Sequence, residues 1–193
     1  MKKLVIFKSI IKKYQKVVIA FSGGVDSALL LKIAIEILGK ENVIAVTAVS
    51  ETYSKEELRI AKNIAQSFNS SHILLETYEF ENNEFINNTP DRCYYCKQEF
   101  YRKVVKFAKE QNYTIILEGS HCDDLLDYRP GRRAVEELGI KSPYIEAGIG
   151  KKEIREIAKA YDIKIWDKPA NPCLASRIPY GVKIGRASCR ERV

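Results

Sequence analysis

The chain has 193 residues, which is enough to bury one sizeable core, and 46% of them are hydrophobic, which excludes an intrinsically disordered chain. No apolar run approaches the ~18 residues of a membrane span, so no membrane partner is expected. The net charge of +7 is compatible with a nucleic-acid partner, but four basic residues and one acidic residue fall in the last twelve positions, which weakens this interpretation. The modest remaining charge suits an anionic nucleotide.

The predicted elements alternate along the chain. Residues 1–14 place lysines between apolar positions at helical spacing, with no small-residue cleavage site after them, which indicates a surface helix rather than a signal peptide. Residues 16–21 predict a buried strand, and the apolar run 28–38 predicts the helix that follows it. Further strands are predicted at 42–49, 71–77 and 114–117, helices at 54–68, 94–111, 132–138 and 151–161, a loop with one helical turn at 79–92, and extended segments at 142–146 and 163–166.

This alternation predicts an α/β fold, a Rossmann-like doubly wound parallel sheet with right-handed crossovers. Ligands of such sheets bind at the carboxyl ends of the strands. We therefore expect a single cleft at that edge, lined by the loops 22–27, 50–53, 119–131 and 167–181. The helix predicted at 54–68 opens with S-x-x-E, the pattern of a capping box.

Residues 22–27 read Ser-Gly-Gly-Val-Asp-Ser and lie between the first strand and its helix. Adjacent glycines let the backbone bend tightly and let a ligand approach, and free N–H groups at a helix start attract anions. Asp26 would repel phosphate, so we expect it beside a metal ion or as a helix cap. The segment matches neither G-x-x-x-x-G-K nor G-x-G-x-x-G, which disfavours a kinase-type loop and a dinucleotide fold. The predicted phosphate-binding residues are Ser22, Gly23, Gly24, Val25, Asp26 and Ser27.

A second polar segment, residues 119–131, follows the fourth predicted strand. Its neighbouring carboxylates, Asp123 and Asp124, suit a Mg²⁺ ion that bridges phosphates, and the alternative is a helix cap with a surface acid. Arg129 lies in a turn stiffened by proline. Its guanidinium is predicted either to bind a phosphate or carboxylate or to pair with Asp127.

Five cysteines without an export signal indicate a reducing cytoplasm. Cys93 and Cys96 are three residues apart at the start of a predicted helix, which would make them neighbours with lowered pKa values. The polar loop before them disfavours dithiol exchange. Cys173 with Cys122 or His121 would complete a zinc site. Three thiolates would alternatively hold an iron–sulfur cluster with one iron open, and two unligated cysteines are the remaining interpretation.

The loop 167–181 holds three prolines and Cys173. Prolines make it too stiff for a helix or a central strand. Ser176 and Arg177 follow the cysteine closely, and a nearby cation favours the thiolate form. We predict Cys173, Ser176 and Arg177 as catalytic residues, and a buried loop cysteine is the alternative.

Five short sequence motifs carry a family resemblance. The first, S-G-G-V-D-S, resembles the PP-loop of the ATP pyrophosphatases. Together the five resemble the LarE family over residues 1 to about 181. They are S-G-G-V-D-S, R-C-Y-Y-C-K, D-Y-R-P-G, W-D-K-P and C-L-A-S-R-I-P-Y-G, in this order.

The resemblance implies an ATP-dependent sulfur transferase that uses ATP and Mg²⁺. Such an enzyme adenylates a carboxylate of a nicotinate-derived mononucleotide, pyridinium-3,5-biscarboxylic acid mononucleotide, and releases pyrophosphate. Sulfur then displaces AMP and leaves a thiocarboxylate, a step in making the nickel-pincer nucleotide cofactor of lactate racemase. A tRNA-thiolating PP-loop enzyme and an inactive nucleotide-binding fragment are the alternatives.

Members of the family obtain sulfur in two ways. Some sacrifice a cysteine, which becomes dehydroalanine, and others hold a [4Fe-4S] cluster on three cysteines and pass on a sulfide bound at the open iron. Because this chain has Cys93, Cys96 and Cys173, it resembles the cluster type. Sacrifice of Cys173 alone is the alternative.

The end of the chain departs from the family pattern. Family members continue into a smaller C-terminal lobe that contributes substrate-binding residues and oligomer contacts. Residues 185–193 have no amphipathic period and resemble translated foreign sequence, in which Cys189 would have no role. We therefore predict one domain over residues 1–181 and a tail over 182–193. The departure weakens the expectation that this chain forms the family's homo-oligomer and has full activity.

Overall fold

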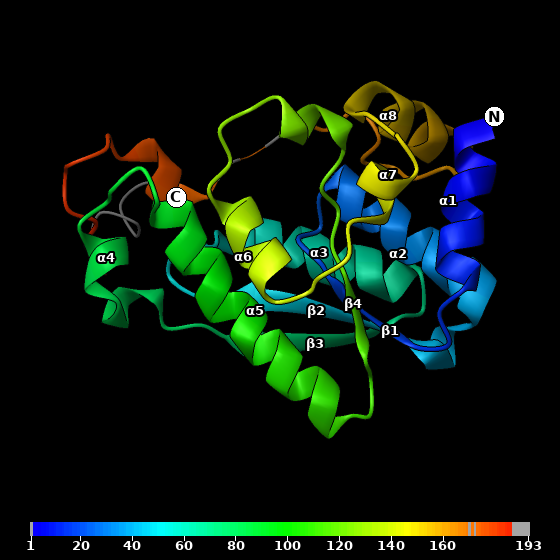
Figure 1. Ribbon diagram of the computed structural model, residues 1–193, viewed down its shortest axis with the longest axis horizontal. Coiled ribbons are helices and arrows are strands. Elements are labelled where there is room, and N and C mark those ends of the chain that lie inside the picture. The colour runs from blue at the N-terminus through cyan, green and yellow to red at the C-terminus, as the bar shows by residue number, and fades with distance from the viewer. Residues whose placement is uncertain (1, 170, 172, 187–193) are drawn as a thin grey trace.

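The computed structural model describes residues 2–169, 171 and 173–186 (Figure 1). Its four strands form one parallel sheet in the order β3-β2-β1-β4. In the centre of the sheet, Val17 lies opposite Val43 on one side and Ile115 on the other. This arrangement confirms the predicted α/β parallel sheet. The strands are β1 Val17–Ala20, β2 Val43–Val49, β3 Ser71–Glu76 and β4 Ile115–Leu117.

Helices cover both faces of the sheet, as the doubly wound class requires (Figure 1). Successive side chains of a strand point to opposite faces. Val17 and Ile19 therefore pack into the core formed with α1, α2, α3 and α8, whereas Val18 packs into the core formed with α5 and α6. The helices are α1 Lys2–Lys12, α2 Val25–Leu38, α3 Lys55–Ser67, α4 Asn83–Ile86, α5 Arg92–Glu110, α6 Gly131–Glu137, α7 Pro143–Glu146 and α8 Lys151–Ala160, with short 3₁₀ helices η1 Lys40–Asn42, η2 Glu79–Glu81, η3 Cys122–Leu125 and η4 Leu174–Arg177.

A third, smaller apolar cluster lies beside α4 and the start of α5. Here the segment 173–186 returns to the domain, and the Ile184 N–H donates to the Ile86 carbonyl at 2.9 Å (Figure 1). The predicted boundary at residue 181 stays a prediction, because residues 187–193, including Cys189, lie outside the described residues. The buried members of this third core are Phe85, Leu174, Ala175, Ile178 and Ile184.

Two local predictions were wrong. Residues 142–146 do not form an extended segment, because Pro143 occupies the first turn of α7, a position that suits its fixed φ and missing N–H. Residues 163–166 form turns, with the Trp166 N–H donating to the Ile163 carbonyl at 2.9 Å. Among the described residues, no helix is long and apolar enough to cross a bilayer.

Candidate active site

The PP-loop segment, residues 22–27, is shaped by its two serines. The Ser27 hydroxyl accepts the Ser22 N–H at 3.3 Å and donates to the Gly24 carbonyl at 3.1 Å. The Ser22 hydroxyl in turn accepts the Gly24 N–H at 3.3 Å. Helix α2 then begins at Val25, so its first N–H groups open toward the end of β1. This local structure is the one that the strand–glycine–helix pattern predicts.

Two glycines allow close approaches that a side chain would prevent. Gly23 has a φ of +72°, and a Cβ there would lie 2.8 Å from the Cα of Ala61 in α3. Gly119 follows β4, and a Cβ there would lie 3.3 Å from the backbone nitrogen of Ser27. The loop after β1 therefore packs closely against α3, and the loop after β4 packs closely against the N-terminus of α2.

Two adjoining cavities lie at the carboxyl ends of the strands. The first cavity, about 340 Å³, separates the PP-loop segment from the segment with Cys173 and Arg177. The second cavity, about 490 Å³, separates the PP-loop segment from residues 118–129. These volumes fall in the range of small-molecule sites. The predicted meeting of four loops is therefore confirmed, and the two cavities share Ser22, Asp26, Tyr53 and Lys151.

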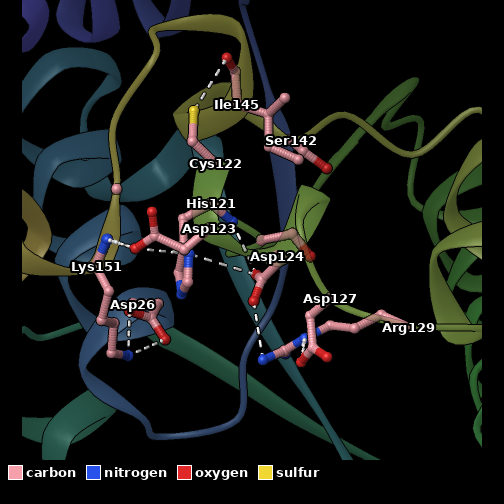
Figure 2. A network of polar contacts seen from close by, with 12 residues as sticks. Asp26, His121, Cys122, Asp123, Asp124, Asp127, Arg129, Ser142, Ile145 and Lys151 are labelled. Carbon is pink, nitrogen blue, oxygen red and sulfur yellow. Dashed lines mark hydrogen bonds and ion pairs between the residues drawn. The ribbon is translucent and has the colours of Figure 1, made fainter.

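Lys151, the first residue of α8, holds a positive charge between the cavities. Its Nζ lies 2.6 and 2.7 Å from the two carboxylate oxygens of Asp26 (Figure 2). Asp26 therefore does not cap α2, whose N-cap is Gly24, and its role as a Mg²⁺ ligand stays a prediction. The sequence pattern gave Lys151 only as the first residue of a predicted helix, residues 151–161, so this functional candidate was missed.

Tyr53, in the loop after β2, contacts the PP-loop segment. Its hydroxyl donates to the carbonyl of Ser22. Burial, and then the charge of Glu57, raises the pKa of Tyr53, so the phenol stays neutral and remains a donor.

The two neighbouring acids after β4 point in different directions. Asp123 accepts the backbone N–H of Lys151 at 2.8 Å, whereas buried Asp124 accepts the N–H of His121 at 3.0 Å and lies 3.0 Å from the Arg129 guanidinium (Figure 2). Each acid therefore already has a donor. Their role as Mg²⁺ ligands stays a prediction.

Arg129 pairs with two carboxylates. Besides Asp124, it lies 3.4 Å from Asp127, the ion pair that the sequence offered as the alternative to a ligand clamp. Its side chain is about half exposed and lines the second cavity, so it still faces a ligand there. Lys97 lines the same cavity from α5.

The outer wall of the first cavity is fixed by Glu57. Both of its carboxylate oxygens lie 2.8 Å from the Nζ of Lys168, and one accepts from Asn171 at 3.0 Å. Ser54 caps α3 by accepting the Glu57 N–H at 3.1 Å. The predicted capping box is therefore only half formed, because the Glu57 carboxylate binds the 168–171 loop instead of the cap.

Cys173 is exposed and lines the first cavity together with Arg177. The pKa of its thiol is raised overall, because burial against the surrounding loops outweighs the hydrogen bonds from Ser176 and the charge of Arg92, which lower it. The expectation that a nearby cation favours the thiolate of Cys173 was therefore wrong. The Ser176 hydroxyl donates to the Cys173 carbonyl at 2.6 Å, which holds the turn. Arg177 donates to Asn171 at 3.3 Å.

Cys93 and Cys96 lie at the start of α5, as predicted. Burial raises the pKa of Cys96 well above its usual range, and the charges of Glu79, Cys173 and Cys93 raise it further. The predicted lowering of the Cys96 pKa was thus wrong, because desolvation outweighs the helix N-terminus. Cys96 packs against the apolar cluster that contains Leu174 and Ala175, the two residues that follow Cys173.

The structure does not place these cysteines as metal ligands. Among residues 2–169, 171 and 173–186, no group of three His, Cys, Asp or Glu side chains could hold a metal ion, so the residues as placed do not fit a closed cluster site. Cys122 points toward the carbonyl of Ile145 at 3.9 Å, away from Asp26 and Asp124 (Figure 2). It therefore does not complete the zinc site that the sequence offered.

Comparison with known proteins agrees with this architecture. A family model described as NAD synthase matches residues 4–91. The NMN synthetase of Francisella tularensis has a similar fold, with a TM-score of 0.67 and 14% identity over 86% of this chain and 74% of that chain. At this identity the likeness concerns the fold alone.

Two relatives extend the match over nearly the whole chain. A protein of Methanocaldococcus jannaschii is 35% identical over 95% of this chain and 70% of its own length. The pyridinium-3,5-bisthiocarboxylic acid mononucleotide synthase of Lactiplantibacillus plantarum is 37% identical over 90% of this chain. The chain spans 63% of the length of that enzyme. From these matches and the PP-loop architecture, we conclude that the chain belongs to the LarE family within the PP-loop ATP pyrophosphatase superfamily.

Proposed function

We propose that this protein uses ATP to activate a carboxylate of a pyridinium mononucleotide and replaces the activated oxygen with sulfur. The observation that carries the proposal is that Cys173 and the PP-loop segment line the same cavity. The name of the relative from L. plantarum supplies the substrate class, a pyridinium mononucleotide with two carboxyl positions.

ATP phosphates would bind at the start of α2. The N–H groups there and the Lys151 ammonium supply positive charge to the same place. Mg²⁺ bound with the phosphates would draw the Asp26 carboxylate away from Lys151 and leave the ammonium to pair with a phosphate. A carboxylate oxygen of the substrate attacks the α-phosphorus, the bond to the β-phosphate oxygen breaks, and pyrophosphate leaves.

Sulfur transfer would then occur from the opposite wall of the first cavity. The Cys173 sulfur attacks the carboxyl carbon of the acyl-adenylate, and the carbon–oxygen bond to AMP breaks. Loss of the Cα proton and cleavage of the Cβ–Sγ bond leave a thiocarboxylate on the substrate and dehydroalanine at position 173. Arg177 faces the same cavity and would neutralise the developing negative charge.

A second source of sulfur is a [4Fe-4S] cluster held by Cys93, Cys96 and Cys173. The packing of Cys96 against Leu174 and Ala175 favours it, and the absence of a metal-binding arrangement among the described residues weighs against it. Such a cluster, when bound, would carry an extra sulfide at its open iron. The free thiols of Cys93, Cys96, Cys122 and Cys173 suit a reducing cytoplasm, in which we place the protein.

The second cavity would hold the mononucleotide. Arg129, Lys97 and Lys151 bring positive charge to its lining, which suits a substrate with a phosphate and carboxylates. The part of the L. plantarum enzyme that lies outside the match would add further substrate and oligomer contacts in that enzyme.

The test compares Cys173→Ala with Cys122→Ala, because Cys122 points away from the cavities. With ATP, Mg²⁺ and the biscarboxylated mononucleotide, wild type and Cys122→Ala should release pyrophosphate and form thiocarboxylate. Cys173→Ala should release pyrophosphate and form none. The protein is also purified without oxygen. Iron analysis then detects a cluster, and mass spectrometry detects a protein that has lost the mass of H₂S.

Two results would contradict the proposal. Thiocarboxylate formation by Cys173→Ala at the wild-type rate would exclude this cysteine as the donor. ATP binding without pyrophosphate release in the presence of substrate would identify a nucleotide-binding module instead. A salt-dependent affinity for tRNA, with no turnover of the mononucleotide, would identify a tRNA-thiolating enzyme.

A further inference from the structure

Two buried polar side chains attach the Cys173 segment to the start of α5. The side-chain nitrogen of Asn88 donates to the carbonyls of Ile178, Pro179 and Val182 at 3.3, 2.7 and 2.8 Å. The backbone carbonyl of Asn88 accepts the Gly181 N–H at 3.1 Å. One asparagine therefore organises the whole turn that follows η4.

Arg92 continues this attachment toward the cysteine. Its Nη1 donates to the side-chain oxygen of Asn88 at 2.6 Å and to the carbonyl of Ala175 at 3.0 Å. Ala175 is two residues from Cys173, and Arg92 immediately precedes Cys93. The guanidinium thus joins the two elements that carry the three thiols.

The burial of Arg92 is costly for a side chain that only ties a loop. It is 4% exposed, its Nε has no hydrogen-bond partner, and no ion pair joins it to a carboxylate within the described part of the chain. Removing a charge without a counter-ion from water is unfavourable, and a neutral side chain would fill this apolar cluster at lower cost. The charge is therefore best explained by the Cys173 segment, where the guanidinium donates to the Ala175 carbonyl and lies 5.0 Å from the centre of the Tyr180 ring.

On the far side, the same segment is attached to the loop after β2. The Leu174 N–H donates to the Thr52 carbonyl at 3.1 Å, and the Thr52 hydroxyl donates to buried Glu79 at 2.7 Å. With Leu174 held to this loop and Ala175 held to α5, the backbone next to Cys173 has one orientation. Its thiol then faces the first cavity.

We propose that Arg92 is a positioning residue that fixes Cys173 beside Cys93 and Cys96, with Asn88 as its partner. The purpose of this arrangement, delivery of sulfur into the first cavity, rests on the proposed function. Burial raises the pKa of Cys173, and the charge of Arg92 only partly opposes this rise. The hydrogen bonds of Arg92 to Asn88 and Ala175 carry the proposal without any effect on this pKa.

The experiment measures whether the Cys173 thiol stays close to the thiols of Cys93 and Cys96. The reduced full chain is treated with dibromobimane, which bridges two nearby thiols, and the peptides joined to Cys173 are quantified by mass spectrometry. Arg92→Met should lower the yield of Cys173 bridged to Cys93 or Cys96 by about fivefold, because the donors to Asn88 and Ala175 are lost. Arg92→Lys should restore most of it. Arg102→Gln, an exposed arginine on the same helix, should match wild type.

A second variant keeps the test decisive if Arg92→Met does not fold. Asn88→Ser removes the donor to three carbonyls but leaves Arg92 in place, and it should lower the same yield. Circular dichroism identifies the folded variants. Wild-type bridging in a folded Arg92→Met or Asn88→Ser protein would overturn the proposal.

Activity separates this inference from the proposed function. If wild type forms thiocarboxylate, Arg92→Met should lower the rate of sulfur transfer while the KM for ATP stays unchanged, since Arg92 lines neither cavity among the described residues. If wild type forms none, the proposed function fails, and the bridging yields still decide the role of Arg92.

Discussion

Lys151 places a single positive charge where the two cavities meet, opposite the N-terminus of α2. Its ammonium is paired with the Asp26 carboxylate. A phosphate bound with Mg²⁺ would satisfy both partners at once, because Asp26 would hold the metal and Lys151 would pair with the phosphate. At the scale of one residue, this exchange of ion-pair partners can be tested by replacing Lys151.

We predict that Lys151→Met raises the KM for ATP by about tenfold to a hundredfold, the loss expected for a hydrogen bond to a charged group. Steady-state release of pyrophosphate gives the measurement. Lys152→Met is the matched control, because Lys152 is exposed on the same turn of α8 and should keep the wild-type KM. An equal effect of the two substitutions would show that the change acts through α8 as a whole.

The sequence could not single out Lys151. Periodicity assigned it to a helix rich in lysine and glutamate, a composition typical of a solvated face. Its function depends on where α8 begins relative to α2, which is a tertiary property. Asp26 was found because its motif is local, whereas its partner lies more than a hundred residues away.

At the scale of elements, α3 and the loop 168–171 are joined by Glu57. The pair with Lys168 is largely buried, with side-chain exposures of 15% for Glu57 and 22% for Lys168. Such a pair contributes more than a surface pair because water screens it less. It fixes the outer wall of the first cavity to the helix that packs against Gly23.

We predict that Glu57→Gln lowers the melting temperature by about 2–4 °C, which corresponds to roughly 1 kcal/mol in a chain of this size. It should also speed proteolysis within residues 168–171, because the loop loses its anchor. Glu56→Gln is the control. That residue forms an exposed pair with Arg59 and should change neither quantity measurably. Identical melting curves for all three proteins would argue against the anchor.

Element type was predictable wherever a segment had a clear period. The alternation of buried strands and amphipathic helices gave the sheet and its crossovers, and the glycine turn gave the start of α2. The two misassigned segments, 142–146 and 163–166, are short and apolar, so their period cannot separate strand from turn. Pro143 was the available signal for α7, because proline favours a first helical turn.

At the scale of the whole molecule, the carboxyl edge of the sheet collects the ligand-binding loops. β1 lies between β2 and β4, and the loops after these strands diverge around the PP-loop segment. The cavities are therefore a property of the topology, and the cleft could be predicted from strand order alone. The third apolar core could not, because it forms between residues far apart in the sequence.

We predict that MgATP stabilises the whole domain. At about 100 times the dissociation constant, binding adds roughly 2.7 kcal/mol, or about 5–10 °C in melting temperature. Differential scanning fluorimetry over a range of ATP concentrations measures the shift. Lys151→Met should show a smaller shift than Lys152→Met at each concentration. A melting temperature that does not depend on ATP would contradict binding at this edge.

The attachment of the Cys173 segment also constrains the order in which the protein can be built. Asn88 leaves the ribosome early, but the carbonyls that it binds belong to residues 178, 179 and 182. The strands and the loop 22–27 can therefore be assembled while translation continues, whereas the turn after η4 cannot close before residue 182 has been added. A nascent chain that stalls between residues 173 and 178 would hold Cys173 without the carbonyls that Asn88 binds.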